Sequence, residues 1–597
     1  MNLKFSNSRT RKQGWALLIV LSLAATGLLL MASVVSWSNQ NSAVVARNNE
    51  TFATAYAAEA ATEKILSQVI QDDQDYGEGL VFSKTSTYSS MLPTATDNSY
   101  WTNYQFSGGT SNNTIVVTRV ISNSSLALGT PYSGLTAIGA TYEIIANAQN
   151  LHSEFGIVST VGQKIILSQI PLFQFAIFYN DFMEFDPGAN MNVIGLVHGN
   201  TNMQIGPGTG VTLSFSNNVS YTGTLTTGSN IYNSGNTGTG TLNFSITPTA
   251  GAVPLNLPVG TNVSGTNTAG VSAILQVPPS GESPTSTIGT NRLFNQADII
   301  VLVSNGNKFT VTSGVDIDGQ ATVVPTNQWS LFLGTNGTFY NGREGLSVNP
   351  ITLNVGALRQ WSSTNTAMRT ALSSAPSRSS STADVQSVFL ADMRTGITNL
   401  EPGIVLSNGA ALPSNGLSIV SPDPVYVVGN WNVTTNVNSS GVPINLTTNS
   451  YSVTNTLPSA IYTDAITILS TAWTPLNSSN SISSRVATSD TVNAAILTGN
   501  VPSTTSNYSG GVENFLRLLE DWSGVNLYYN GSMVEMFASQ IGKAPWPGTG
   551  VVYNPPTRDW AFDNNFLNPA QLPPLTPKVI YLQRASWTTL PPYTTQF

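Results

Sequence analysis

The stretch at residues 14–37 reads GWALLIVLSLAATGLLLMASVVSW and contains no charged side chain over 24 residues. A helix of that length rises about 1.5 Å per residue and spans about 36 Å, which is enough to cross the hydrocarbon core of a membrane. Trp15 and Trp37 stand at its two ends, where indole rings favour the membrane interface. Four basic residues precede the stretch, and no acidic residue does. The basic residues are Lys4, Arg9, Arg11 and Lys12. The sequence therefore predicts a membrane span with its N-terminus in the cytoplasm and everything after Trp37 exported.

The helical pattern continues beyond the predicted span. Apolar positions recur at a spacing of four, at Ala57, Ala61, Ile65 and Val69, and neither Gly nor Pro occurs between Leu28 and Asp75. We expect one helix over about residues 15–70, roughly 80 Å long. The alternative is a cleaved secretory signal peptide, whose apolar region usually covers only about 7 to 15 residues.

Two segments carry a resemblance to a known family: RKQGWALLIVLSLAATGLLLM at 11–31 and RNNETFATAYAAEAATEKI at 47–65. Over about residues 9–70 the chain resembles the N-terminal segment of PilX-type minor pilins. The resemblance implies a prepilin leader that ends at Gly14, a mature chain that begins at Trp15, and pilin or pseudopilin partners along the helix. Major pilins carry Glu at the fifth mature position, where this chain has Ile19. That departure implies a minor or tip position in a filament.

The composition is that of a neutral exported protein. Charged residues make up 9% of the 597 residues, against about 25% in a typical soluble domain, while hydrophobic residues reach 41%. With a net charge of −8 and only 22 Lys and Arg, the chain has no basic patch that could neutralise a nucleic acid. It has no Cys, so disulfides and thiolate metal sites are excluded.

After the helix, the chain is rich in predicted strands. The segments TIVVTRVIS (114–122) and TYEIIANAQN (141–150) alternate with period two, as half-buried strands do. Residues 73–180 are therefore predicted to pack on the helix as a β-rich, pilin-like α+β head. Asp72, Asp73, Asp75 and Glu78 mark the end of the stalk, and a calcium site there is the alternative interpretation.

From residue 181 short apolar groups alternate with Gly, Asn and Pro turns at intervals of about ten residues. This alternation of short apolar segments and turns predicts a right-handed parallel β-helix, or solenoid, in a mainly β protein. The predicted division has seven parts: leader 1–14, transmembrane and stalk helix 15–72, head 73–180, solenoid 181–300, an inserted α+β domain 301–400, solenoid 401–568 and a Pro-rich tail 569–597. The stretch GVENFLRLLEDWSG (511–524) is predicted as an amphipathic helix that caps the solenoid, with Phe515, Leu518, Leu519 and Trp522 on one side.

The C-terminal block carries a second resemblance. The phrases ADMRT, GVENFLRLLEDW and YNPPTRDWAFDNNF, within about residues 391–568, are similar to the passenger of large PilX-like proteins of Gram-negative bacteria. This resemblance implies an architecture and assigns no activity.

The sequence offers few candidates for catalysis. It has two His, His152 and His198, which without Cys cannot build a zinc site unless carboxylates help, and no Gly-x-Ser-x-Gly elbow. Asp181, Glu184 and Asp186 form an acidic cluster, and strand alternation puts Glu184 and Asp186 on one face, as a glycosidase pair would need. The alternative, which we favour, is an ordinary turn before Pro187 and Gly188.

A second charged group comprises Asp392, Arg394, Arg343 and Glu344, which we interpret as a buried ion-pair set between the inserted domain and the solenoid. No catalytic residue, cofactor or metal ligand is assigned, and the protein is expected not to be an enzyme.

Three functions remain. The first is a minor pilin or pseudopilin-like component of a type IV pilus or type II secretion-like system, displaying a β-solenoid for filament assembly or adhesion. The second is a membrane-anchored β-helix that binds or cleaves polysaccharide, and the third is an envelope-anchored surface protein outside any filament. The expected location is a single-pass inner-membrane anchor with the bulk of the chain outside, on a pilus or the cell surface. The expected partners are the membrane, pilin subunits and a surface glycan or substratum ligand, but no nucleic acid.

Overall fold

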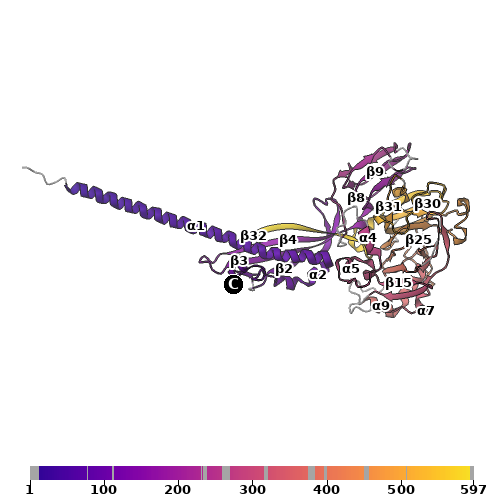
Figure 1. Cartoon of the computed structure of the whole chain (residues 1–597), viewed down its shortest axis with the longest axis horizontal. Helices are drawn as coiled ribbons and strands as arrows, with labels where there is room; N and C mark the ends of the chain where they lie inside the picture. The colour runs from indigo at the N-terminus through magenta and orange to yellow at the C-terminus, as the bar shows by residue number, and fades with distance from the viewer. Residues whose placement is uncertain are drawn as a thin grey trace, which may run out of the picture.

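A computed structural model of the chain shows a rod that ends in a wider head (Figure 1). It describes residues 13–76, 78–109, 113–229, 232, 238–257, 269–314, 321–373, 384–395, 400–448, 456–505 and 507–591. The first twelve residues of the predicted leader lie outside these ranges.

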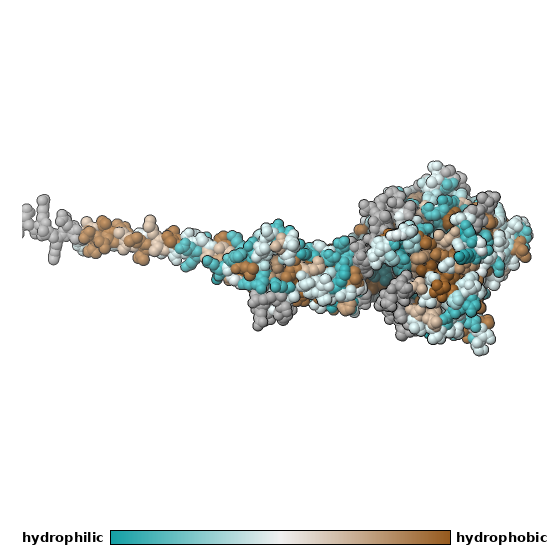
Figure 2. Space-filling view, turned by 60° about the horizontal axis from the view of Figure 1, so that its bottom comes forward, coloured by the Kyte–Doolittle hydropathy of each residue, from teal (hydrophilic) through white to brown (hydrophobic). Residues whose placement is uncertain are grey.

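The rod begins with α1 (Gln13–Tyr76), a single helix of 64 residues that includes the predicted processing position at Gly14 and Trp15. The predicted long apolar N-terminal helix is thus confirmed. Its first part, residues 15–49, is exposed along its whole length: Trp15, Leu29 and Trp37 are 73%, 68% and 68% exposed. Figure 2 shows this part as a thin, largely hydrophobic stalk. Within the described residues, α1 is the one helix that is long and apolar enough to cross a membrane.

The second part of α1 packs on an antiparallel sheet, and together they form the stem. The sheet has the order β1-β3-β4-β32, and β2 pairs with the remaining length of β3. Its strands are β1 (Tyr104–Ser107), β2 (Val116–Ala127), β3 (Thr136–Asn150), β4 (Val158–Pro171) and β32 (Lys578–Leu590); α2 (Glu78–Ser83), α3 (Thr85–Ser89) and η1 (Ser99–Asn103) connect the helix to it.

Small side chains let α1 approach the sheet closely. Ala57, Ala58 and Ala61 on the helix are at most 2% exposed, and Ala140 and Ala146 of β3 are fully buried in the same cluster. The face of α1 that carries Ala57 and Ala61 is therefore covered by the chain's own sheet.

The predicted Pro-rich tail at 569–597 needs a correction. It contains η8 (Pro569–Gln571) and then β32, which pairs with β4 over twelve residue pairs. The residues predicted as a pilin-like head, 73–180, thus belong to the stem as far as Pro171. The wider head of Figure 1 is the part between Pro171 and Lys578, which is an insertion between two neighbouring strands of the stem sheet. Both of its ends are held by the stem.

In the first part of the head, successive strands of the chain belong in turn to three different sheets. Within each of these sheets the strands are parallel. The first sheet receives β5 (Phe175–Tyr179), β8 (Leu196–Gly199), β11 (Val219–Tyr221) and β14 (Thr249–Ala250). The second receives β6 (Met183–Phe185), β9 (Met203–Ile205) and β12 (Leu225–Thr227), and the third β7 (Met191–Val193), β10 (Thr212–Phe215) and β13 (Thr241–Phe244). We call this part the first stack.

After α4 (Ala269–Ser272), η3 (Ala273–Leu275), α5 (Thr287–Asn291) and α6 (Leu293–Gln296), the chain builds a second stack. One row contains β15 (Ile299–Ser304), β21 (Ser387–Asp392), β24 (Leu417–Val420), β26 (Ser459–Thr463), β28 (Asp490–Asn500) and β30 (Asn526–Ala538), with β16 (Lys308–Ser313) antiparallel at its end and β31 (Thr557–Phe562) beside β30. A six-stranded sheet contains β17 (Leu333–Gly334), β20 (Ile351–Asn354), β23 (Ile404–Ser407), β25 (Val425–Val428), β27 (Ile466–Leu469) and β29 (Arg517–Leu518).

The two stacks join edge to edge, because β30 pairs in parallel with β5. The rows that contain these two strands thereby become one sheet of twelve strands. We call this junction the seam.

Two further predictions about the head are wrong. Residues 301–400 are not a separate inserted domain, because β20 and β21 pair with β23 and β24 of the following turns. The rest of this region holds α7 (Thr326–Trp329), β18 (Phe339–Asn341), β19 (Leu346–Val348), α8 (Val355–Thr364) and α9 (Thr366–Ser373). The predicted capping helix is instead η6 (Val512–Asn514) followed by β29, because pairing with β27 prevails over the helical pattern.

The chain's remaining described elements are short: η2 (Leu172–Gln174), β22 (Leu400–Glu401), η4 (Pro475–Asn477), η5 (Ile482–Ser484) and η7 (Asn564–Leu567).

Candidate functional site

The acidic side chains at and just after the end of α1 form hydrogen bonds within the stem. Asp72 accepts hydrogen bonds from Tyr88 Oη at 2.6 Å and Lys84 Nζ at 3.2 Å, and Glu78 accepts from Tyr142 Oη at 2.6 Å. Burial raises the pKa of Asp73 to about 7, and the negative charge of Glu78 adds to the effect. The side chain of Asp75 lies outside the described residues. Within those residues, no group of three or more His, Asp or Glu side chains could hold a metal ion.

His198 is a packed core residue. Its Nδ1 lies 2.8 Å from Ser220 Oγ and its Nε2 lies 2.9 Å from Asn200 Oδ1, while its ring stacks on Phe178 at 5.5 Å. Burial lowers its pKa to about 4, so the imidazole is neutral at physiological pH. His152 is exposed in the turn after β3.

The four charged residues interpreted as one ion-pair set lie in two separate groups. Arg394 forms a buried pair with Asp392 at 2.5 Å. Glu344 pairs with Arg517 at 2.9 Å, a partner that the sequence did not reveal because it lay in the predicted capping helix. Arg343 donates to the carbonyl oxygens of Ala544 and Ser509, and burial lowers its pKa to about 9.

The acidic cluster at 181–186 lies at the seam, against two segments of the second stack, 508–513 and β30. Ser509 Oγ donates to Glu184 at 3.0 Å, and Tyr508 Oη donates to Asp186 at 2.9 Å. The Asp186 backbone N–H donates to Glu513 Oε1 at 3.1 Å. The backbone N–H of Asp181 donates to the carboxylate of Glu535, at 3.0 Å.

A groove of about 800 Å³ opens beside Asp186. First-stack loops at 186–191 and 208–211 form one wall, and second-stack segments at 508–514 and 546–558 form the other. The residues that give it chemical character are Asp186, Asn190, Tyr508, Glu513, Trp546 and Arg558. We call it the seam groove.

The aromatic side of the seam groove is held in place by hydrogen bonds. The rings of Tyr508 and Trp546 meet edge to face, 5.6 Å apart. The Trp546 backbone N–H donates to the Tyr508 carbonyl at 2.8 Å, and its indole Nε1–H donates to Tyr553 Oη at 3.2 Å. Tyr508 and Trp546 are each only partly buried.

Glu513 lies in the floor of the groove and is 6% exposed. Its Oε1 accepts from Asp186, but its buried Oε2 has no hydrogen-bond partner. Burial, with a contribution from the nearby Asp186, raises its pKa to about 8. The group is therefore largely protonated at neutral pH.

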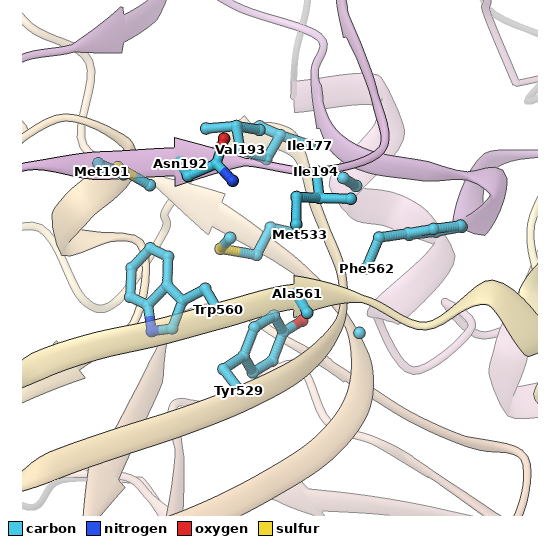
Figure 3. A pocket seen from close by; sticks show the side chains of 12 residues that line it. Ile177, Met191, Asn192, Val193, Ile194, Tyr529, Met533, Trp560, Ala561 and Phe562 are labelled. Atoms are coloured by element: carbon cyan, nitrogen blue, oxygen red, sulfur yellow. The ribbon is translucent and has the colours of Figure 1, made fainter. Parts of the chain in front are cut away.

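A second hollow at the seam is apolar and small. Figure 3 shows Met533 of β30 between Val193 of β7 and Trp560 and Phe562 of β31. Its volume is about 20 Å³, room for a single water. This contact holds the stacks together and offers no reactive group.

The raised carboxyl pKa values predict that the head is most stable in acid. For Glu513 the folded-state pKa, about 8, lies above the ordinary value of 4.5, so its stabilising contribution is complete below about pH 4.5. It is lost as the pH rises through about 8. Burial also raises the pKa of Asp423 to about 8. We expect the free energy of unfolding, measured by urea titration, to fall between pH 5 and pH 8.5.

The variant Glu513→Gln should flatten that pH dependence by an amount on the order of 3 kcal/mol, because the amide cannot ionise. The exposed Glu154 provides the matched control, and Glu154→Gln should leave the curve unchanged. A Glu513→Gln protein with the parental pH dependence would contradict a buried, protonated Glu513.

No family model matches this chain, and no curated protein matches it. Among solved structures, it is similar to the crystal structure of the competence-associated pilin ComZ from Thermus thermophilus. The identity is 9% and the TM-score is 0.24, over 90% of this chain and 97% of that chain. A similarity at this level establishes neither fold nor function for the present chain.

Proposed function

We propose that the protein is a minor pilin- or pseudopilin-like component that anchors in the inner membrane and carries its β-rich head to the cell surface. The observation that supports this most is the division of α1. Its first part is apolar and exposed, whereas its second part is packed against the stem sheet. A helix that leaves one apolar part uncovered has the form of an anchor that a membrane or neighbouring helices would cover.

The position of the head supports display. It is inserted between β4 and β32, at the far end of the stem from the exposed part of α1 (Figure 1). We infer that its two stacks form a β-solenoid, since successive strands return to the same parallel sheets. The basic residues before α1 support a cytoplasmic N-terminus and an exported head.

We propose a structural or adhesive role without catalysis. His198 is enclosed by the core, and Glu184 is held by serine side chains. An envelope-anchored protein outside any filament remains the second candidate, because α1 would serve it equally well as an anchor.

The test is the N-terminus of the protein in sheared surface filaments, from cells with and without a prepilin peptidase. We expect a mature chain that begins at Trp15 in filaments from cells with the peptidase. Without it, the uncleaved chain should remain in the membrane fraction. A Gly14→Leu variant should reproduce the second result in cells that contain the peptidase.

Two results would oppose the proposal. An uncleaved chain confined to the membrane in cells with the peptidase would favour the envelope-anchored alternative. Release of the whole chain after cleavage near Trp37 would indicate a secretory signal.

A further inference from the structure

The seam groove is formed by both stacks and does not exist in either alone. Asp186 and Asn190 come from the first stack, and Tyr508, Trp546 and Arg558 from the second. Its volume of about 800 Å³ lies within the range of small-molecule binding sites, about 300–1,000 Å³. The groove is therefore large enough to hold a ligand of several rings.

The charges in the groove argue against an anionic ligand. Of the residues that line it, one is basic, Arg558, and it is balanced by the carboxylate of Asp186, because Glu513 is largely protonated at neutral pH. A nucleic acid or another polyanion needs several Lys or Arg side chains to neutralise its charge. Arg558 also lies 5.6 Å from the ring of Trp560, which reduces its freedom to follow a charged chain.

The remaining chemistry suits a ligand with many hydroxyl groups. Asn190 is exposed, whereas Asp186 is 6% exposed and its carboxylate already accepts from Tyr508 Oη; their amide and carboxylate groups can bond to hydroxyls. Partly exposed Tyr508 and Trp546 supply ring faces on which the C–H face of a sugar can pack. Pro187, Pro555 and Pro556 add apolar surface without further donors.

We propose that the seam groove binds a neutral oligosaccharide, with Trp546 as the stacking platform and Asp186 as a hydrogen-bond acceptor. This deepens the proposed adhesive function and rests on it for biological meaning. The binding itself is independent of anchoring or filament assembly.

The experiment measures binding by the purified full-length chain in detergent micelles, using isothermal calorimetry. The neutral probes are cellohexaose, maltohexaose and the hexamer of N-acetylglucosamine; the anionic probes are hexagalacturonate and a single-stranded DNA hexamer. We expect at least one neutral hexamer to bind, and neither anionic probe to bind more tightly. Trp546→Ala should weaken that binding about tenfold or more, whereas Trp546→Phe, which keeps a ring, should lose less.

Trp587→Ala is the matched control, because Trp587 is 50% exposed on β32 in the stem and does not line the groove. It should leave binding unchanged. Thermal unfolding of each variant establishes that the head is folded. A Trp546→Ala protein that fails this check is replaced by Asp186→Ala, for which the same weakening is expected.

The proposal is overturned if no neutral hexamer binds at millimolar concentration, if an anionic probe binds more tightly, or if folded Trp546→Ala or Asp186→Ala binds like the parent. These results would leave the anchoring proposal intact, because N-terminal processing does not involve the groove. Conversely, an unprocessed chain that binds a hexamer would support the groove and oppose the pilin-like role.

Discussion

A chain that ends at Pro577 is expected to lose the folded stem. Such a truncation removes β32, which pairs with β4 at twelve residue positions. At a net contribution of about 1 kcal/mol for each backbone hydrogen bond, the loss is comparable to the whole stability of a typical domain, about 5–15 kcal/mol. It also exposes β4 as an unpaired edge, which invites aggregation. We expect the truncated protein to be insoluble or to be cleaved rapidly by protease within the stem.

A chain that ends at Pro591 retains all of β32 and is the matched control, with the stability of the parent. The pairing can also be tested directly, because the chain has no Cys. Cysteines at Ile166 and Gln583, which are Cα partners, should form a disulfide under mild oxidation. The pair Thr118 and Gln583, on strands at opposite edges of the sheet, should not. A soluble, protease-resistant chain ending at Pro577 would contradict this role of β32.

The stem shows which structural elements a local sequence pattern can predict. The helix was predictable because its apolar run and its four-residue spacing are both local signals, as Ala57, Ala61 and Ile65 illustrate. The strand β32 was missed although KVIYLQRASWTTL is rich in β-branched and aromatic residues. Prolines at 573, 574, 577 and 591 surround it and suggested an irregular tail. Its partner β4 lies about 400 residues earlier, so no local pattern could reveal the pairing.

The head shows a similar limit. Short apolar groups between turns correctly indicated parallel sheets, but not the order of their strands. The pair of β5 and β30 brings Tyr179 beside Glu535, positions more than 350 residues apart. The seam groove depends on that pair. Asp186 could be selected from the sequence as a candidate site residue because it lies in a local acidic cluster. Glu513 and Trp546 could not, because only the long-range pairing brings them to the groove. The helical spacing of Phe515, Leu518, Leu519 and Trp522 was misleading, because all four are buried in a segment without an α-helix.

Gly531→Ala is expected to be among the most destabilising single substitutions in the head. Gly531 lies in β30, with Ala494 of β28 on one side and Phe562 of β31 on the other. A Cβ at this position would lie 1.9 Å from the Ala494 carbonyl oxygen and 2.7 Å from Tyr529 Oη. Because backbone cannot move aside as a flexible side chain can, the cost should reach or exceed the upper end of typical overpacking, about 3 kcal/mol.

The substitution should also disturb the hydrogen bonds and strand pairing of β30. Tyr529 Oη donates to the same Ala494 oxygen at 2.9 Å, so an added methyl group would also break that bond. A displaced β30 would then pull away from β5 and open the seam. Urea unfolding and limited proteolysis should show a weakened head and cleavage near the seam. Gly79→Ala is the control: nothing lies within 4 Å of a Cβ at that helical position, so the stability should be unchanged or slightly higher. If Gly531→Ala unfolded like Gly79→Ala, β28 and β30 could not be as closely paired as their register requires.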